Sequence, residues 1–154
     1  VYTTLHTNDA LGAIPRLSDI GVPAHLLAGS LIGCLAQRLA RKICTYCRKP
    51  RKATAEECKI LGVDESKAPQ IYEASGCEKC NNKGVRGRTA IVEVLRVDRG
   101  MDELIATNAT RRVMMEYALK NGFVTMQQDG INKVLAGEIT LEELITTIDL
   151  TDRL

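Results

Sequence analysis

The apolar and polar residues at the start of the chain predict a strand, and the residues that follow have apolar side chains at helical spacing. Residues 1–7, VYTTLHT, are rich in β-branched side chains and predict a strand. Apolar residues recur at helical spacing over residues 10–19, and Gly21 follows them, so we expect a helix that ends there. Pro15 lies inside this pattern and should kink the helix.

The segment Pro23–Ile43 predicts the longest helix of the chain. Proline suits a first helical position, which Pro23 would occupy. The final turn of the segment is basic, which complements the helix dipole. The side chains expected on its buried side are Leu27, Leu31, Cys34, Leu35 and Leu39.

A polar, cysteine-bearing stretch over residues 44–88 separates this helix from the next apolar run. Within the stretch, Thr54 and Glu57 form a capping box that predicts a short helix ending near Leu61. Residues Arg88–Val97 alternate well enough to predict a strand.

From Gly100 onward, the pattern predicts four short helices with short connections, which we expect to form a small bundle. The first covers residues 101–107. The other three begin at threonines that can serve as N-caps, namely Thr110, Thr125 and Thr140. Glu143 lies three residues after the last of these and completes a second capping box.

Composition limits how this chain can form a core. Of its 154 residues, 45% are hydrophobic and 26% charged, as in soluble globular proteins, but there is one Phe and no Trp. The core must therefore be aliphatic. No stretch approaches the roughly 18 apolar residues that span a bilayer, and the N-terminus lacks a signal-peptide pattern. Because the chain opens without Met inside a strand-like run, we interpret it as a fragment of a longer, cytoplasmic protein.

Four of the six cysteines form two CxxC pairs separated by 29 residues: Cys44, Cys47, Cys77 and Cys80. Two such pairs can complete a tetrahedron around one ion, so the spacing predicts a structural zinc site. Four thiolate ligands leave no open coordination position, and such a site cannot activate water. Cys34 and Cys58 lie on helical patterns and are expected to be small buried hydrophobes.

Other cysteine chemistries fit this pattern less well. A disulfide framework belongs to exported proteins, and no export signal is visible. A redox pair of the thioredoxin type needs one CxxC at a strand-to-helix turn and not two. An iron–sulfur cluster remains an alternative to zinc.

A basic stretch surrounds the first cysteine pair: Arg38–Lys52 contains seven basic residues and no acid. Such a stretch can bind nucleic acid or another anionic partner. It can equally offset the negative charge of a zinc tetrathiolate. The sequence leaves both interpretations open.

His6 ends the first predicted strand just before a helix, where phosphates bind in α/β sheets. A lone histidine in a strand is also compatible with a purely structural role. No GxxxxGK[ST] phosphate loop and no other glycine-rich phosphate cradle occur in the chain. The residues alone therefore do not predict a complete enzyme.

Four segments of the chain, in this order, resemble the secretion ATPases, the motors of type II secretion and type IV pilus assembly. The resemblance runs essentially from Val1 to Leu150, with Thr4 standing where the family commonly has Ser. Retraction ATPases of pili lack the four cysteines, which favours an assembly motor. The segments are TTLHTNDALGAIPRLSDIGVP, LAQRLARKICTYC, CEKCNNKGVRGRTAIVEVL and QDGINKVLAGEITLEEL.

This resemblance implies an α/β fold. Residues 1–43 would form the C-terminal end of a RecA-like P-loop ATPase core, residues 44–88 a tetracysteine zinc subdomain, and residues 89–154 a strand with a C-terminal helical subdomain. The family's histidine maps onto His6, where it would lie close to the nucleotide phosphates. The phosphate loop and acidic boxes would lie upstream of Val1, so the fragment alone is expected to be inactive.

The resemblance also implies partners and a location. The full-length protein would be a hexamer that uses ATP and Mg²⁺ at the cytoplasmic face of the inner membrane. It would assemble pseudopili or pili through an inner-membrane platform protein, and no nucleic acid is expected.

Two other functions are compatible with the residues. A zinc-ribbon nucleic-acid-binding module would use the basic stretch together with Arg86 and Arg88. Only Tyr46 and Tyr72 are available to stack on bases near the cysteines, which counts against this alternative. A protein-docking role of the zinc subdomain overlaps with the ATPase hypothesis.

Overall fold

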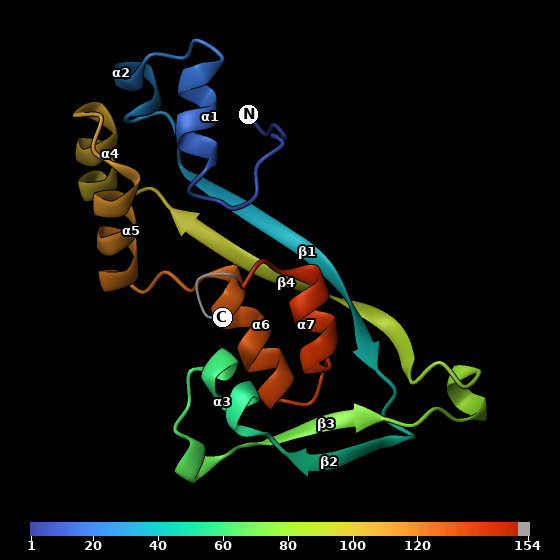
Figure 1. The fold of residues 1–154 in the computed structure, drawn as a ribbon. Helices are drawn as coiled ribbons and strands as arrows, with labels where there is room; N and C mark the ends of the chain where they lie inside the picture. Colours follow the sequence, from blue (N-terminus) through green and yellow to red (C-terminus); the bar gives the residue numbers. More distant parts are fainter. Residues whose placement is uncertain (151–154) are drawn as a thin grey trace. The chain divides into compact units, whose positions relative to one another are not determined.

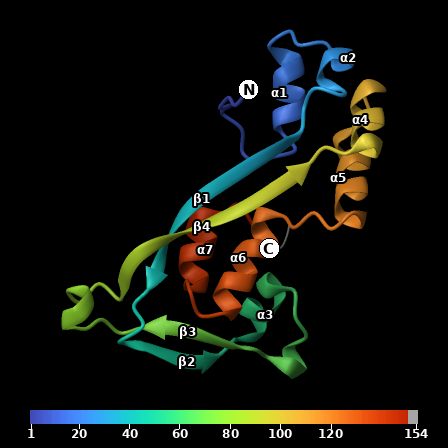
Figure 2. The same cartoon turned by 180° about the vertical axis from the view of Figure 1, so that it is seen from behind.

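The computed structural model describes residues 1–150 of the chain and divides into two compact units. One unit consists of Val1–Gln37 and Val92–Met126, and the described residues of the other are Arg38–Ile91 and 127–150. The two long strands β1 (Gly33–Ile43) and β4 (Val85–Arg96) pair with each other (Figures 1 and 2). Each strand contributes residues to both units.

The first unit contains four helices besides its share of the two strands (Figure 1). They are α1 (Ala13–Asp19), α2 (Ala24–Leu27), α4 (Arg99–Ala106) and α5 (Arg111–Lys120). Asp98 caps α4 by accepting the Met101 N–H, and the Tyr117 hydroxyl donates to the same carboxylate at 2.8 Å. The aliphatic core of the first unit includes Leu11, Ile14, Leu95, Met101, Ile105 and Met114.

The second unit contains an antiparallel ribbon of β2 (Arg48–Lys52) and β3 (Gln70–Ala74), in which Pro50 lies opposite Tyr72. The helices of this unit are α3 (Ala55–Leu61), α6 (Met126–Leu135, apart from its first residue) and α7 (Leu141–Thr147), with 3₁₀ turns η1 (Glu65–Lys67) and η2 (Glu78–Cys80). Its buried side chains include Ile43, Cys58, Ile71, Ile91, Ile131, Val134 and Leu144.

The predicted capping box of α3 is confirmed. Thr54 Oγ1 accepts the Glu57 N–H at 3.3 Å, and Glu57 Oε2 accepts the Thr54 N–H at 2.8 Å. Gly62 ends the helix in the left-handed region at φ 70°. The Glu57 carboxylate also binds both terminal nitrogens of Arg51, at 2.7 and 2.6 Å, which joins α3 to β2.

The predicted strand over residues 1–7 is wrong, because this segment has no regular secondary structure. A strand needs a neighbouring strand for its ladder, and in the described residues β1 pairs with β4 and β2 with β3. Pro15 does not interrupt a helix interior, since it is the third residue of α1. The N–H groups of a first helical turn have no intrahelical partner, so proline is tolerated there.

The long helix predicted over Pro23–Ile43 is also wrong. Only the four residues of α2 are helical, Gly29 adopts φ 78°, and β1 begins at Gly33. Side chains four residues apart share a face in a strand as well as in a helix, so the apolar spacing did not distinguish the two. Cys34 therefore lies on a strand and is half-buried, whereas Cys58 on α3 is buried as predicted.

The four helices predicted after Gly100 are present as α4 to α7. A single four-helix bundle is not what the structure describes, because α4 and α5 belong to the first unit and α7 and nearly all of α6 to the second. The compact units thus divide the chain differently from the ranges 1–43, 44–88 and 89–154.

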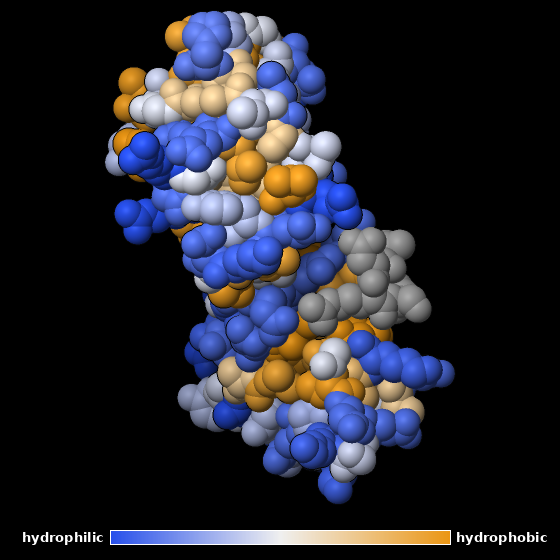
Figure 3. Space-filling view, turned by 90° about the vertical axis from the view of Figure 1, so that its left-hand side faces the viewer, coloured by the Kyte–Doolittle hydropathy of each residue, from blue (hydrophilic) through white to orange (hydrophobic). Residues whose placement is uncertain are grey.

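Large apolar side chains remain exposed, among them Ile32, Leu35 and Leu39. The face in Figure 3 carries hydrophobic patches among hydrophilic residues. Within residues 1–150, no helix combines the length and hydrophobicity needed to cross a bilayer.

The ion pair of Glu57 predicts a specific dependence of stability on pH. The Arg51 guanidinium lowers the pKa of Glu57 from 4.5 to about 2, against the opposing effect of burial. The stabilisation is therefore fully present above pH ~4.5 and disappears as the pH falls towards about 2. Since Arg51 is partly exposed, we expect on the order of 2 kcal/mol, measured as the difference in unfolding free energy between wild type and Glu57→Gln.

The matched control for this experiment is Glu56→Gln, which changes an exposed neighbour on the same helical turn. Urea unfolding of both variants between pH 2 and 7 measures the effect. A wild-type advantage over Glu57→Gln that is equal at all these pH values would contradict the assignment.

Candidate metal centre

The four predicted ligands lie at the ends of strands and in short turns of the second unit. Cys44 directly follows β1, and Cys47 directly precedes β2. Cys77 precedes the 3₁₀ turn η2, and Cys80 ends it. In each pair, the amide of the second cysteine donates to the carbonyl of the first, at 3.4 and 3.1 Å. The backbone thus directs both side chains of a pair towards one point.

The four sulfur atoms converge closely. All lie within 4.8 Å of one another, and the Sγ–Sγ distances are 3.9 Å for Cys44–Cys77, 3.9 Å for Cys47–Cys80 and 3.8 Å for Cys77–Cys80. A tetrahedron with metal–sulfur bonds of ~2.3 Å has edges of about 3.8 Å. All six cysteines are free thiols, so no disulfide accounts for this proximity. The arrangement fits one tetrahedrally coordinated metal ion.

Backbone amides stabilise negative charge on one of these sulfurs. Burial opposes ionisation of Cys80, but amide hydrogen bonds from Cys77 and Gly84, both 3.2 Å long, lower its pKa to about 6. Burial instead raises the pKa of Cys47 to about 12. Four thiolates this close can coexist only when a cation offsets their charge, which is the chemistry that a metal ion supplies.

The turn around the second pair requires unusual backbone angles. Gly76 has φ 87°, and a Cβ at this position would lie 2.8 Å from the carbonyl oxygen of Asn82. Asn81 and Asn82 also adopt left-handed conformations, at φ 51° and 59°. Gly84, at φ 70°, presents its amide to the sulfur of Cys80. Gly87, which follows in the chain, also has a positive φ, at 79°.

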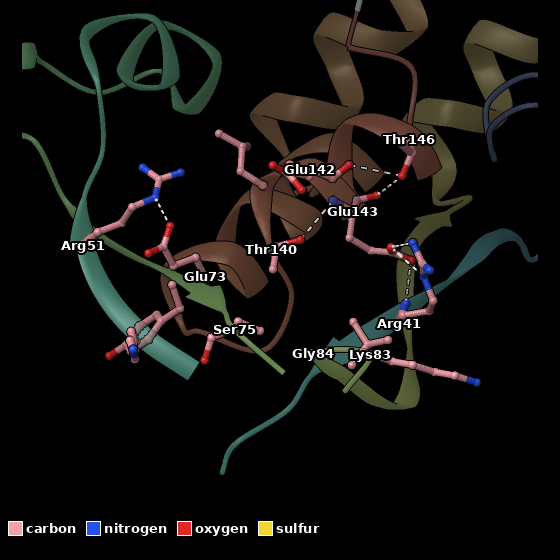
Figure 4. A pocket seen from close by; sticks show the side chains of 15 residues that line it. Arg41, Arg51, Glu73, Ser75, Lys83, Gly84, Thr140, Glu142, Glu143 and Thr146 are labelled. Atoms are coloured by element: carbon pink, nitrogen blue, oxygen red, sulfur yellow. Dashed lines mark hydrogen bonds and ion pairs between the residues drawn. The ribbon is translucent and has the colours of Figure 1, made fainter. Parts of the chain in front are cut away.

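The arginines of the basic stretch Arg38–Lys52 make interactions within the protein. Arg48 lies over the ring of Tyr72, 4.9 Å from its centroid, and donates to the carbonyl of Gly137 at 2.7 Å. Arg41 donates its backbone amide and its guanidinium to Glu143, at 2.7 to 2.9 Å (Figure 4). The predicted capping box of α7 is therefore only half present. Thr140 caps the helix by accepting the Glu143 N–H, but the Glu143 carboxylate binds Arg41 and not the backbone of Thr140. The lysines of the stretch, Lys42, Lys49 and Lys52, are exposed.

A polar cleft of about 500 Å³ lies beside the Arg41–Glu143 pair (Figure 4). Its charged lining residues carry both signs: Arg41, Lys49, Arg51, Lys83, Glu73, Glu142 and Glu143. Nucleic-acid-binding surfaces carry predominantly positive charge. The mixed charge of this cleft does not favour the nucleic-acid alternative.

His6 and the four cysteines belong to different compact units. His6 belongs to the first unit, lies exposed outside any helix or strand, and makes no hydrogen bond or ion pair within residues 1–150. The residues that follow it are well fixed, because Asp9 binds the Gly12 N–H at 2.7 Å and the guanidinium of Arg111.

The sequence interpretation missed one buried acid in this unit, Glu93. Its only signal was a carboxylate inside the apolar strand segment AIVEVL. A charged residue is rarely buried without specific partners, so its position in this run could have identified it.

Comparison with known proteins places the chain in a family. The pattern described as "Type II/IV secretion system protein" matches residues 1–146. The chain is 43% identical over 145 residues to the type II secretion system protein E of Pseudomonas aeruginosa, and 41% identical over 145 residues to the type II secretion system ATPase E of Vibrio cholerae. Each alignment covers 94% of this chain and 29% of the relative.

Pilus proteins are similar to a comparable degree. The chain is 39% identical over 147 residues to the type IV pilus assembly ATPase PilB of Thermus thermophilus. This alignment covers 94% of this chain and 16% of that protein. The chain therefore spans less than a third of the length of these relatives. On this evidence, it belongs to the type II/IV secretion system protein family.

Proposed function

We propose that this chain is part of a hexameric ATPase that powers the assembly of pseudopili or pili. The observation that carries the proposal is the similarity over 94% of the chain to relatives named as type II secretion and type IV pilus assembly ATPases. Because the chain spans less than a third of these relatives, the activity belongs to the longer protein.

In this proposal, residues of the chain complete a RecA-like nucleotide site whose phosphate loop and Mg²⁺ ligands lie elsewhere in the protein. His6 approaches the γ-phosphate of ATP and responds to its presence. The chain alone is therefore inactive. The partners are further subunits of the ring and an inner-membrane platform protein, at the cytoplasmic face of the inner membrane.

The metal in this proposal is zinc, bound by Cys44, Cys47, Cys77 and Cys80. When bound, it supplies charge neutralisation and a fixed tetrahedral geometry, and no position for substrate or water. The cysteines connect the end of β1, the start of β2 and the turn before β4 at one point. Their role is to stabilise the second unit, and the ATPase reaction takes place elsewhere.

The proposed role of His6 is tested by His6→Ala in the full-length protein. Loss of a group that binds the phosphates more strongly in the transition state than in bound ATP should lower kcat for ATP by about 10²-fold. KM and zinc content should stay close to wild type. His25→Ala, which changes an exposed histidine on α2, is the control and should hydrolyse ATP normally. Unchanged turnover by His6→Ala would contradict the proposal.

Removal of zinc tests the structural role of the cysteines. Zinc binding contributes ~10–16 kcal/mol to the folding of small zinc modules. Chelation should therefore accelerate amide hydrogen exchange throughout the second unit, including α7, which Arg41 contacts through Glu143. Exchange in α4 and α5 of the first unit should change little.

The matched variants in this experiment are Cys77→Ser and Cys34→Ser. The first should reproduce the effect of chelation without a chelator, and the second should retain one zinc ion per chain. Undiminished protection of the second unit in protein shown to be free of metal would rule out a structural role.

A further inference from the structure

Glu93 is the most deeply buried carboxylate described in the first unit, with an exposed fraction of 5%. Each of its oxygens accepts one backbone amide. Oε1 accepts the N–H of Ala10 at 2.6 Å, and Oε2 accepts the N–H of Met126 at 2.8 Å. Within residues 1–150, no cationic side chain contacts this carboxylate. The acid thus connects two distant backbone segments to β4 through hydrogen bonds alone.

Burial of a polar side chain is unfavourable unless hydrogen bonds compensate for the loss of water. An apolar side chain at this position would avoid the cost of burying a carboxylate, but it would leave both backbone amides without an acceptor. The value of Glu93 therefore lies in where it places the two segments. One of these segments contains Ala10, four residues after His6.

A second contact reaches the same segment from another element. Arg111, the first residue of α5, donates two hydrogen bonds to the carboxylate of Asp9, at 3.1 and 2.7 Å. Asp9 Oδ1 also accepts the Gly12 N–H, which joins this contact to the start of α1. Two adjacent residues, Asp9 and Ala10, are thus bound from α5 and from β4.

His6 lies three residues before Asp9 and has an exposed side chain. Between them, the Thr7 hydroxyl donates to the carbonyl of Asp9 at 3.0 Å and closes the intervening turn. Contacts that hold Asp9 and Ala10 in place therefore restrict the position of the backbone at His6. The imidazole itself stays available for a ligand.

We propose that Glu93 and Arg111 are positioning residues for His6, which bind the segment after it so that the imidazole meets the nucleotide phosphates in one constant geometry. This inference rests on the proposed ATPase function. Neither residue needs to touch the nucleotide. Misplacement of a group by about 1 Å can lower a rate by as much as 10²-fold, so contacts of this kind matter to turnover.

The experiment measures ATP hydrolysis by the full-length protein in a double-mutant cycle. Arg111→Ala, at a partly exposed surface position, should lower kcat roughly tenfold with little change in the KM for MgATP. In the His6→Ala background, the same substitution should produce no further loss, because the group that it positions is already absent. Arg111→Lys keeps the charge without the two-pronged contact and should recover part of the activity.

Glu93→Gln tests the buried contact. The amide side chain can accept from one backbone N–H, but its NH₂ group faces the other N–H, so one amide is left without an acceptor. We expect a decrease in kcat that is likewise absent in the His6→Ala background. The melting temperature of each variant identifies loss of folding. Arg112→Ala, which removes only the exposed Arg112–Glu116 pair of α5, is the control and should retain wild-type kcat.

The outcomes separate the two proposals. A full-length wild type without ATP turnover would overturn the proposed function and this inference with it. Turnover that depends on His6 but is unchanged by Arg111→Ala would overturn the inference alone. Equal fractional losses from Arg111→Ala in the wild-type and His6→Ala backgrounds would also overturn it, since the residue would then act independently of His6.

Discussion

The convergence of four cysteine sulfurs within 4.8 Å is the constraint on which the second unit depends. Buried Cys44, Cys47 and Cys80 form a small cluster of their own, and partly buried Ala74 and Cys77 pack against it. The chain has one Phe and no Trp, so the surrounding aliphatic core is modest. One metal ion bound by these sulfurs would add a connection between strand ends to that core.

The two units are stabilised by different chemistry. In the second unit, arginines at the ends of β1 and β2 bind Glu143, Gly137 and Glu57, so the basic stretch is largely used for internal contacts. In the first unit, a buried acid on β4 and an arginine on α5 bind the segment after His6. The cysteine cluster thus brings strand ends together in one unit, and polar contacts fix the segment after His6 in the other.

Apart from the convergence of the two cysteine pairs, the features that the sequence predicted correctly are local in the chain. The capping box of Thr54 and Glu57 needs residues three positions apart, and each CxxC pair needs the same spacing. The features that it missed depend on distant partners. Glu93 binds amides 83 and 33 residues away, and Glu143 binds Arg41, 102 residues away, in place of its own helix cap. Strand β1 was mistaken for a helix because its four-residue apolar spacing fits both structures, and pairing with β4 decides between them.

The measurement that tests this account most directly is the zinc K-edge X-ray absorption spectrum of the metal-loaded protein. A closed site made of Cys44, Cys47, Cys77 and Cys80 predicts four sulfur scatterers at about 2.3 Å and no lighter ligand. A nitrogen or oxygen ligand, or fewer than four sulfurs, would contradict it, because the ion would then have a position open to water or substrate.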